Sequence, residues 1–250
     1  MPDMALRVLV LIAAIQQLLF PLFINPFAAG NNPVRSSMPS QIEPAGYAFS
    51  IWGPIYLLAL AYGIWQLTLG RNYGETLRIA PLALVLYCGS SAWLYAAKYG
   101  PLFATIPILA VMAICATCCL LIALQNGPRT GLSWWVLMLP FALYAGWTVC
   151  ATFVNAAEVA PAYGFDRFGL SVAGYALLSI CVVGVVALAL VWRTHGNPPF
   201  AATIVWALVA IAVAGVRRGA DQAVVSAALL AAVATAALVI VLRLSSRTGG

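Results

Sequence analysis

Long apolar stretches, separated by short groups of charged residues, glycine and proline, dominate the pattern along this chain. A helix needs about 20 predominantly apolar residues to cross the roughly 30 Å hydrocarbon core of a bilayer. The pattern predicts eight membrane-spanning helices, at residues 5–27, 47–69, 79–98, 101–124, 133–156, 169–193, 200–216 and 223–243. The seventh stretch is the shortest, so seven spans stay as an alternative.

Composition supports this interpretation, because 64% of the 250 residues are hydrophobic and only 7% are charged. Ten-residue segments of alternating polarity, which are typical of outer-membrane barrels, are absent from the sequence. We therefore predict an all-α, polytopic helical membrane protein. The first apolar stretch resembles a signal peptide, but it continues to Phe27 without a small-residue cleavage site, so we expect a retained first span.

Charge and cysteine content exclude several classes of function. The net charge of +6 is spread singly over many loops, so the sequence has no concentrated basic face for nucleic acid. All six cysteines fall inside predicted spans, and the C-x-x-C formed by Cys115 and Cys118 has no second pair or histidine at ligand spacing. We therefore predict neither disulfides nor a metal site. Lys98, the only lysine, lies at a predicted helix end, which argues against a retinal-binding photoreceptor.

An aromatic block opens the second predicted span. Phe49, Trp52 and Tyr56 are three or four residues apart, so a helix brings them onto one face. Tryptophan and tyrosine also mark the lipid interface of membrane proteins, which is the alternative explanation. Because Trp52 lies inside the span, the block favours the wall of a binding site.

Three sequence blocks together resemble a known family. The first runs from Pro44-Ala45-Gly46-Tyr47-Ala48-Phe49 to Trp52 and Tyr56. The second has Pro81-Leu82 with Trp93 twelve residues later, and ends at Lys98-Tyr99-Gly100. The third is the most specific, with Tyr144, Trp147, Ala151, Thr152 and Asn155 in the spacing Tyr-x-x-Trp-x-x-x-Ala-Thr-x-x-Asn. These blocks resemble the tryptophan-rich sensory protein family, also called the TspO/MBR or translocator protein (peripheral benzodiazepine receptor) family.

The resemblance covers roughly residues 5–157 and implies a five-helix bundle whose pocket binds porphyrins, sterols or benzodiazepine-like drugs. The loop at residues 28–46 would close that pocket. Trp52 and Trp147 would form aromatic walls, with Tyr56 beside the first. The ligand-binding residues that it implies are Phe49, Trp52, Tyr56, Trp93, Tyr144, Trp147, Ala151 and Asn155. It implies a porphyrin or haem-like ligand without a covalently bound cofactor, and a homodimer.

The sequence departs from the family pattern at several positions. Ala92 replaces an asparagine that precedes the third-helix tryptophan, with Ser90 and Ser91 nearby. Ala45 and Tyr47 replace a proline and a tryptophan of the loop motif. Residues 156–159 lack the family's aromatic segment after the fifth span, so we do not expect cholesterol recognition.

Several polar residues have more than one interpretation. The amide of Asn155 needs a partner in apolar surroundings, and both a helix-to-helix hydrogen bond and a ligand contact are consistent with its position. Gln16 and Gln17 lie inside the first span, where a pocket wall and a helix contact are both consistent with the sequence. The charged residues Glu43, Glu158, Asp166 and Arg167 are expected to be exposed in loops.

We predict a TspO-like bundle at residues 1–157, followed by three additional transmembrane helices at residues 158–250. The favoured function is a membrane receptor or binding protein for a hydrophobic or amphipathic planar ligand such as a tetrapyrrole, in a sensory or regulatory role. The alternative is a transporter of a small hydrophobic substrate, although no intramembrane acid–base pair or internal repeat is visible. No catalytic residues are predicted; light-dependent porphyrin breakdown, proposed for the family, is the enzymatic alternative. We expect a multi-pass protein of a bacterial-type inner (plasma) membrane, with the lipid bilayer and a small hydrophobic ligand as its partners.

Overall fold

A computed structural model describes residues 2–24, 41–127, 130–159, 163–164 and 169–248 of the chain. Within these residues the fold consists of helices and turns, without a strand. In this described part of the chain, eight helical segments are long and apolar enough to cross a membrane. The predicted all-α polytopic fold with eight spans is therefore confirmed.

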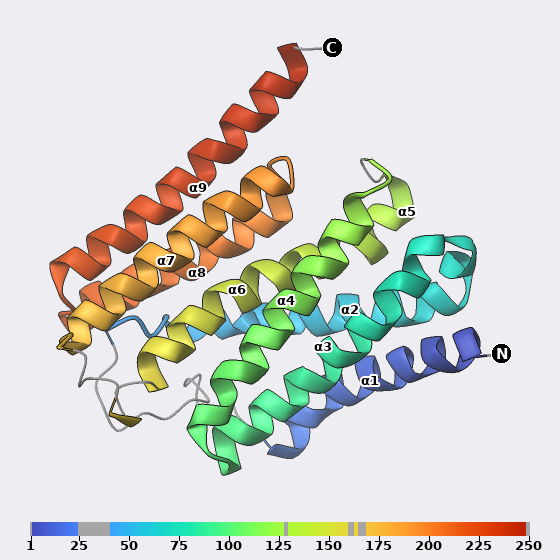
Figure 1. Ribbon diagram of the computed structural model, residues 1–250, viewed down its shortest axis with the longest axis horizontal. Coiled ribbons are helices and arrows are strands. Elements are labelled where there is room, and N and C mark those ends of the chain that lie inside the picture. Colours follow the sequence, from blue (N-terminus) through green and yellow to red (C-terminus); the bar gives the residue numbers. More distant parts are fainter. Residues whose placement is uncertain (1, 25–40, 128–129, 160–162, 165–168, 249–250) are drawn as a thin grey trace. The chain divides into compact units, whose positions relative to one another are not determined.

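The helices follow one another closely along the chain (Figure 1). The main ones are α1 (Pro2–Ile24), α2 (Trp52–Leu67), α3 (Gly74–Tyr99), α4 (Thr105–Leu124), α5 (Gly131–Ser133), α6 (Leu139–Val159), α7 (Val172–Arg193), α8 (Pro198–Arg218) and α9 (Gln222–Thr248). Short 3₁₀ turns are η2 (Gly46–Ile51), η3 (Leu69–Asn72) and η4 (Leu102–Ala104), and a π-helical turn η5 (Trp134–Met138) joins α5 to α6. Most of the predicted loop at 28–46 lies outside the described residues.

The chain divides into two compact units. The first contains Met1–Pro33 and Phe49–Thr148, and the second contains Val34–Ala48 and Val149–Gly250. The division therefore falls inside α6. A boundary at residue 157 between a family-like bundle and additional helices stays a prediction.

In the first unit, α3 packs against both α1 and α4, and α1 also packs against α2. Gly63 of α2 permits the close approach of α1, because a Cβ at this position would lie 3.2 Å from Leu11 Cδ1 and 3.3 Å from Leu11 Cα. Small residues at such crossings let helix backbones approach within a membrane. The close contact between α1 and α2 thus depends on glycine at position 63.

In the second unit, α9 packs against both α7 and α8. The helix starts have clear local causes. The Ser171 side chain accepts a hydrogen bond from the Gly174 amide at 3.1 Å, and the Asn197 side chain accepts one from the Phe200 amide at the same distance. Side-chain acceptors at this position satisfy amides that have no partner inside the helix.

The segment 41–48, which precedes α2, is part of the second unit. The Ala45 amide donates to the carbonyl of Ala210 in α8 at 3.1 Å. The indole N–H of Trp206, also in α8, donates to the Ala48 carbonyl at 3.2 Å. Both bonds satisfy backbone groups of an irregular segment, so α8 holds this segment in place.

Of the four charged residues that were expected to be exposed in loops, the structure describes Glu43 and Glu158. Glu43 forms an ion pair with Arg218 at 3.0 Å, with both side chains about one-third exposed. The expectation for Glu158 is wrong, because this residue is buried and lies in the last turns of α6, which continues to Val159. Asp166 and Arg167 lie outside the described residues.

Gly219 ends α8 in the left-handed region, with φ of 66° and ψ of 36°. A Cβ at this position would meet no atom within 4 Å, so the backbone conformation alone requires glycine. We expect Gly219→Ala to lower the free energy of unfolding by about 1 kcal/mol. Gly219→Asn should restore part of this loss, because asparagine tolerates the left-handed region better than alanine. Thermal unfolding of the purified variants measures both effects, and equal stability of the alanine and glycine proteins would contradict the prediction.

Candidate functional site

A cluster of aromatic rings fills the interior of the first unit. Trp52 and Tyr56 come from α2, Trp93 from α3, and Tyr144 and Trp147 from α6. All five side chains are buried, with at most 4% of their surface exposed. Phe49 of η2 and Tyr87 of α3 contact the others from the edge, and we call these seven residues the ring cluster.

Trp52 is the centre of the ring cluster. Its ring centroid lies 5.2 Å from that of Tyr56 and 6.1 Å from that of Trp93, both in tilted arrangements. It also makes edge-to-face contacts with Tyr144 at 5.8 Å and with Trp147 at 6.1 Å. Aromatic pairs at such distances and angles attract each other beyond simple area burial. The position of Trp52, as the first residue of α2, lets it reach rings from α3 and α6 as well as its own helix.

The edges of the cluster are also defined by ring contacts. Phe49 packs edge-to-face on Trp147 with centroids 5.8 Å apart. Tyr87 stacks on Tyr144 at 6.1 Å, with an angle of 28° between the ring planes. Sequence reasoning missed Tyr87, although it lies three residues before Ser90, which bonds to Tyr56, and thus on the same side of α3.

Two tyrosine hydroxyls of the cluster have polar partners. The Tyr56 hydroxyl and the Ser90 hydroxyl are 2.8 Å apart and share a hydrogen bond. The Tyr144 hydroxyl donates to Oε1 of Gln17 in α1 at 2.9 Å. Gln17 therefore faces the interior of the first unit. Ser90, rather than the exposed Ala92, supplies the polar group of α3 at the rings.

Three indole N–H groups of the cluster remain unpaired. Nε1 of Trp52, of Trp93 and of Trp147 is buried and has no hydrogen-bond partner among the described residues. The same holds for Nε2 of Gln17 and for the Tyr87 hydroxyl. Most buried polar atoms in proteins do have a partner, and an unpaired one in an apolar interior raises the free energy of the folded state. So many unpaired donors in one cluster are consistent with a molecule that brings acceptor atoms.

The remaining residues implied by the resemblance lie outside the ring cluster. Ala151 and Asn155 are further along α6, in the part that belongs to the second unit. Ala151 is half-buried and Asn155 is buried. Tyr47, at the tryptophan position of the loop motif, packs edge-to-face on Trp206 with centroids 5.1 Å apart, also within the second unit.

Six of the seven side chains of the ring cluster carry a hydroxyl or an indole N–H group, and Phe49 is purely apolar. Such a set can stack on a planar molecule and donate hydrogen bonds to it. The groups that the cluster offers are aromatic faces for stacking and N–H and O–H groups for hydrogen bonds.

A sequence profile of the family described as TSPO-like protein matches residues 5–242 of the chain. The match continues through α7 and α8 and into α9, well beyond the segment at residues 5–157 that carries the sequence resemblance. No curated protein and no solved structure matches the chain significantly.

Proposed function

The chain belongs to the TSPO-like protein family and is a multi-pass integral membrane protein, and on this basis we propose that it binds a hydrophobic or amphipathic planar ligand at the ring cluster. A tetrapyrrole such as a porphyrin is the ligand class that we favour, and a sensory or regulatory role in a bacterial-type inner membrane is the expected context. The residues that would contact the ligand are Trp52, Tyr56, Trp93 and Trp147.

The observation that carries the proposal is the set of three unpaired indole N–H groups on contacting rings. A planar ligand that stacks on the face of one indole could accept a hydrogen bond from the N–H of another indole whose ring is nearly perpendicular, as Trp147 is to Trp52 at 83°. Trp52 touches both of the other tryptophans, so one ligand near Trp52 is within reach of all three. Because the rings contact each other, the ligand has to replace ring–ring contacts with ring–ligand contacts.

Titration of the detergent-purified protein with protoporphyrin IX, followed by quenching of tryptophan fluorescence, tests the proposal. We expect saturable quenching, and about a tenfold weaker affinity in both Trp52→Phe and Trp147→Phe. Each substitution removes one N–H donor and part of a stacking surface, which together contribute about 1–2 kcal/mol.

The matched control is Trp135→Phe. Trp135 lies in η5 of the same unit, but 58% of its surface is exposed and it is not part of the ring cluster. The control protein should bind protoporphyrin IX like the unmodified chain. Linear quenching that all three substitutions leave unchanged would mean that the porphyrin partitions into the micelle, and the proposal would then be rejected.

A further inference from the structure

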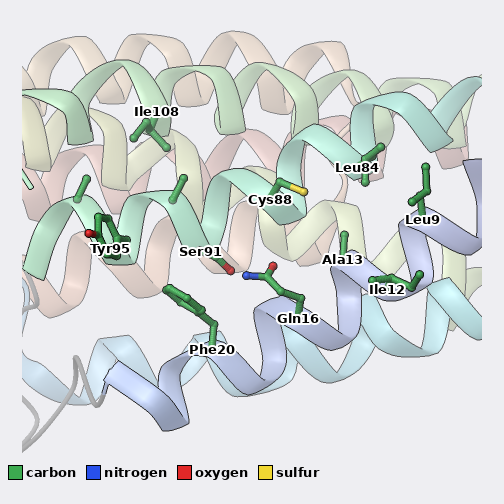
Figure 2. A pocket seen from close by; sticks show the side chains of 12 residues that line it. Leu9, Ile12, Ala13, Gln16, Phe20, Leu84, Cys88, Ser91, Tyr95 and Ile108 are labelled. Carbon is green, nitrogen blue, oxygen red and sulfur yellow. The ribbon is translucent and has the colours of Figure 1, made fainter. Parts of the chain in front are cut away.

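A groove runs along the surface of the first unit between α1 and α3 (Figure 2). Its volume is about 630 Å³, within the range of sites that hold small organic molecules. Leu9, Ile12 and Phe20 of α1 form one wall, and Leu84, Cys88 and Tyr95 of α3 form the other. None of the residues that line the groove is charged. We call this site the α1–α3 groove.

Two polar side chains lie in this apolar groove. Ser91 of α3 is 5% exposed, and its hydroxyl has no hydrogen-bond partner among the described residues. Figure 2 shows the Ser91 oxygen pointing into the groove, toward the amide of Gln16 on the opposite wall. Gln16 is half-buried and thus accessible from the groove. A buried hydroxyl without a partner is unfavourable, so a polar atom bound in the groove beside Ser91 would lower the free energy of the protein.

Both polar groups lie deep in the apolar part of their helices. Gln16 precedes the end of α1 by eight residues, and Ser91 precedes the end of α3 by the same number. At 1.5 Å per residue, each lies about 12 Å from the helix end. Both groups thus lie well inside helices that are long and apolar enough to cross a membrane, so a molecule dissolved in the bilayer can approach the groove from the side.

We propose that the α1–α3 groove is a second binding site, separate from the ring cluster, for a neutral membrane-soluble molecule with a hydroxyl or carbonyl group. The oxygen of that group bonds to the Ser91 hydroxyl and the Gln16 amide, and its hydrocarbon part lies along Leu9, Ile12 and Phe20. A carbonyl accepts a hydrogen bond from both side chains. A hydroxyl accepts from one of them and donates to the other.

A second copy of the chain is a less suitable occupant. Ser91 is buried in the wall of the groove, so a helix lying across this face would not reach its hydroxyl. A small molecule enters the groove and satisfies that hydroxyl, which a flat helix–helix contact would leave unpaired.

Cysteine labelling reports on the groove without involving the tryptophans. Cys88 is exposed and lines the groove, whereas Cys181 is exposed on α7 and serves as an internal control. The full-length protein in detergent is treated with N-ethylmaleimide, and mass spectrometry gives the labelling rate of each cysteine. Hexadecan-1-ol, hexadecan-2-one and hexadecane, which share one chain length, are the probes.

We expect the alcohol or the ketone to slow the labelling of Cys88 about fivefold at saturation, while Cys181 is unaffected and hexadecane has little effect. The comparison of alcohol and ketone identifies which oxygen group the groove prefers. In Ser91→Ala and in Gln16→Leu, the concentration needed for half-protection should rise about 3- to 10-fold, as expected for the loss of one neutral hydrogen bond.

The adjacent serine provides the matched control. Ser90 bonds to Tyr56 on the ring side of α3, so Ser90→Ala should leave the protection of Cys88 intact. Equal protection by hexadecane, or protection that Ser91→Ala does not weaken, would overturn the proposal. Protection of Cys88 that depends on protein concentration alone would assign the face to a second copy instead. The labelling readout uses neither porphyrin nor tryptophan fluorescence. Its result therefore tests the α1–α3 groove independently of ligand binding at the ring cluster.

Discussion

Replacing Trp52 by alanine is expected to lower the free energy of unfolding by about 3–5 kcal/mol. Trp52 contacts the rings of Tyr56, Trp93, Tyr144 and Trp147, which come from three different helices. Alanine would leave a cavity among these rings, and the surrounding helices cannot close around it without moving. Equilibrium unfolding in mixed micelles, as the fraction of a denaturing detergent rises, measures the loss.

The control for this substitution is Trp135→Ala in the same unit. Because Trp135 is 58% exposed, its removal should cost less than about 1 kcal/mol. If both alanine variants lost the same stability, Trp52 would not be the packing centre of the first unit. Trp52→Phe is expected to lose less than Trp52→Ala, since a ring of similar shape keeps most of the contacts.

A second large effect is expected at Arg7, a charged residue that is only 5% exposed. Its guanidinium donates to the carbonyl of Gln66 at 2.6 Å and to the carbonyl of Arg71 at 3.3 Å. The Gln66 side chain in turn donates to the Arg7 carbonyl at 2.9 Å. The Arg7 guanidinium therefore binds carbonyls at the end of α2 and in η3, where helix carbonyls lack partners inside the helix.

We expect Arg7→Met to lower the free energy of unfolding by about 2–4 kcal/mol, because two carbonyls lose a charged donor while the apolar stem is kept. Arg7→Lys should lie between methionine and arginine, since a single ammonium does not reproduce the fork of the guanidinium. The same mixed-micelle unfolding measures both variants. Arg71→Met is the control, because its side chain is exposed and only its backbone carbonyl takes part. A loss in the control as large as that in Arg7→Met would contradict this explanation.

Hydropathy alone placed the spans within a few residues, because long apolar stretches fix helix positions in a membrane. The main error concerns the start of the third span, which begins at Gly74 and not near residue 79. The predicted span at residues 79–98 leaves Glu75 and Arg78 in the preceding loop. In the structure, Asn126 donates to the Glu75 carboxylate at 3.2 Å and Arg78 donates to Gln125 at 2.7 Å. Partners on the segment after α4 thus allow α3 to begin earlier.

Burial of charge was harder to predict than the spans. Arg7, Glu75 and Glu158 are all buried, yet nothing in their local sequence distinguishes them from exposed charges. Arg7 and Glu75 bond to groups that lie more than 50 positions away in the chain. The register of two packed helices decides such contacts, and hydropathy does not specify that register.

The rings that the motifs singled out do lie together, with Tyr56, Trp93, Tyr144 and Trp147 each in contact with Trp52. Their ligand remains a prediction. The sequence did not separate the two adjacent serines, of which Ser90 faces the rings and Ser91 faces the α1–α3 groove. Consecutive helix positions differ by about 100° in direction, so the axial rotation of α3 decides their roles.

The attachment of residues 41–48 to α8 has a consequence for the order of events during synthesis. Ala48 and its partner Trp206 are separated by 158 positions in the chain. At about 5–20 residues per second, the ribosome delivers the partner on the order of 10–30 s after the segment itself. During that interval α2 is already synthesised, while the backbone groups of residues 41–48, which precede it, still lack their partners in α8. A nascent chain arrested before α8 would therefore leave the amide of Ala45 and the carbonyl of Ala48 open to solvent or to insertion factors.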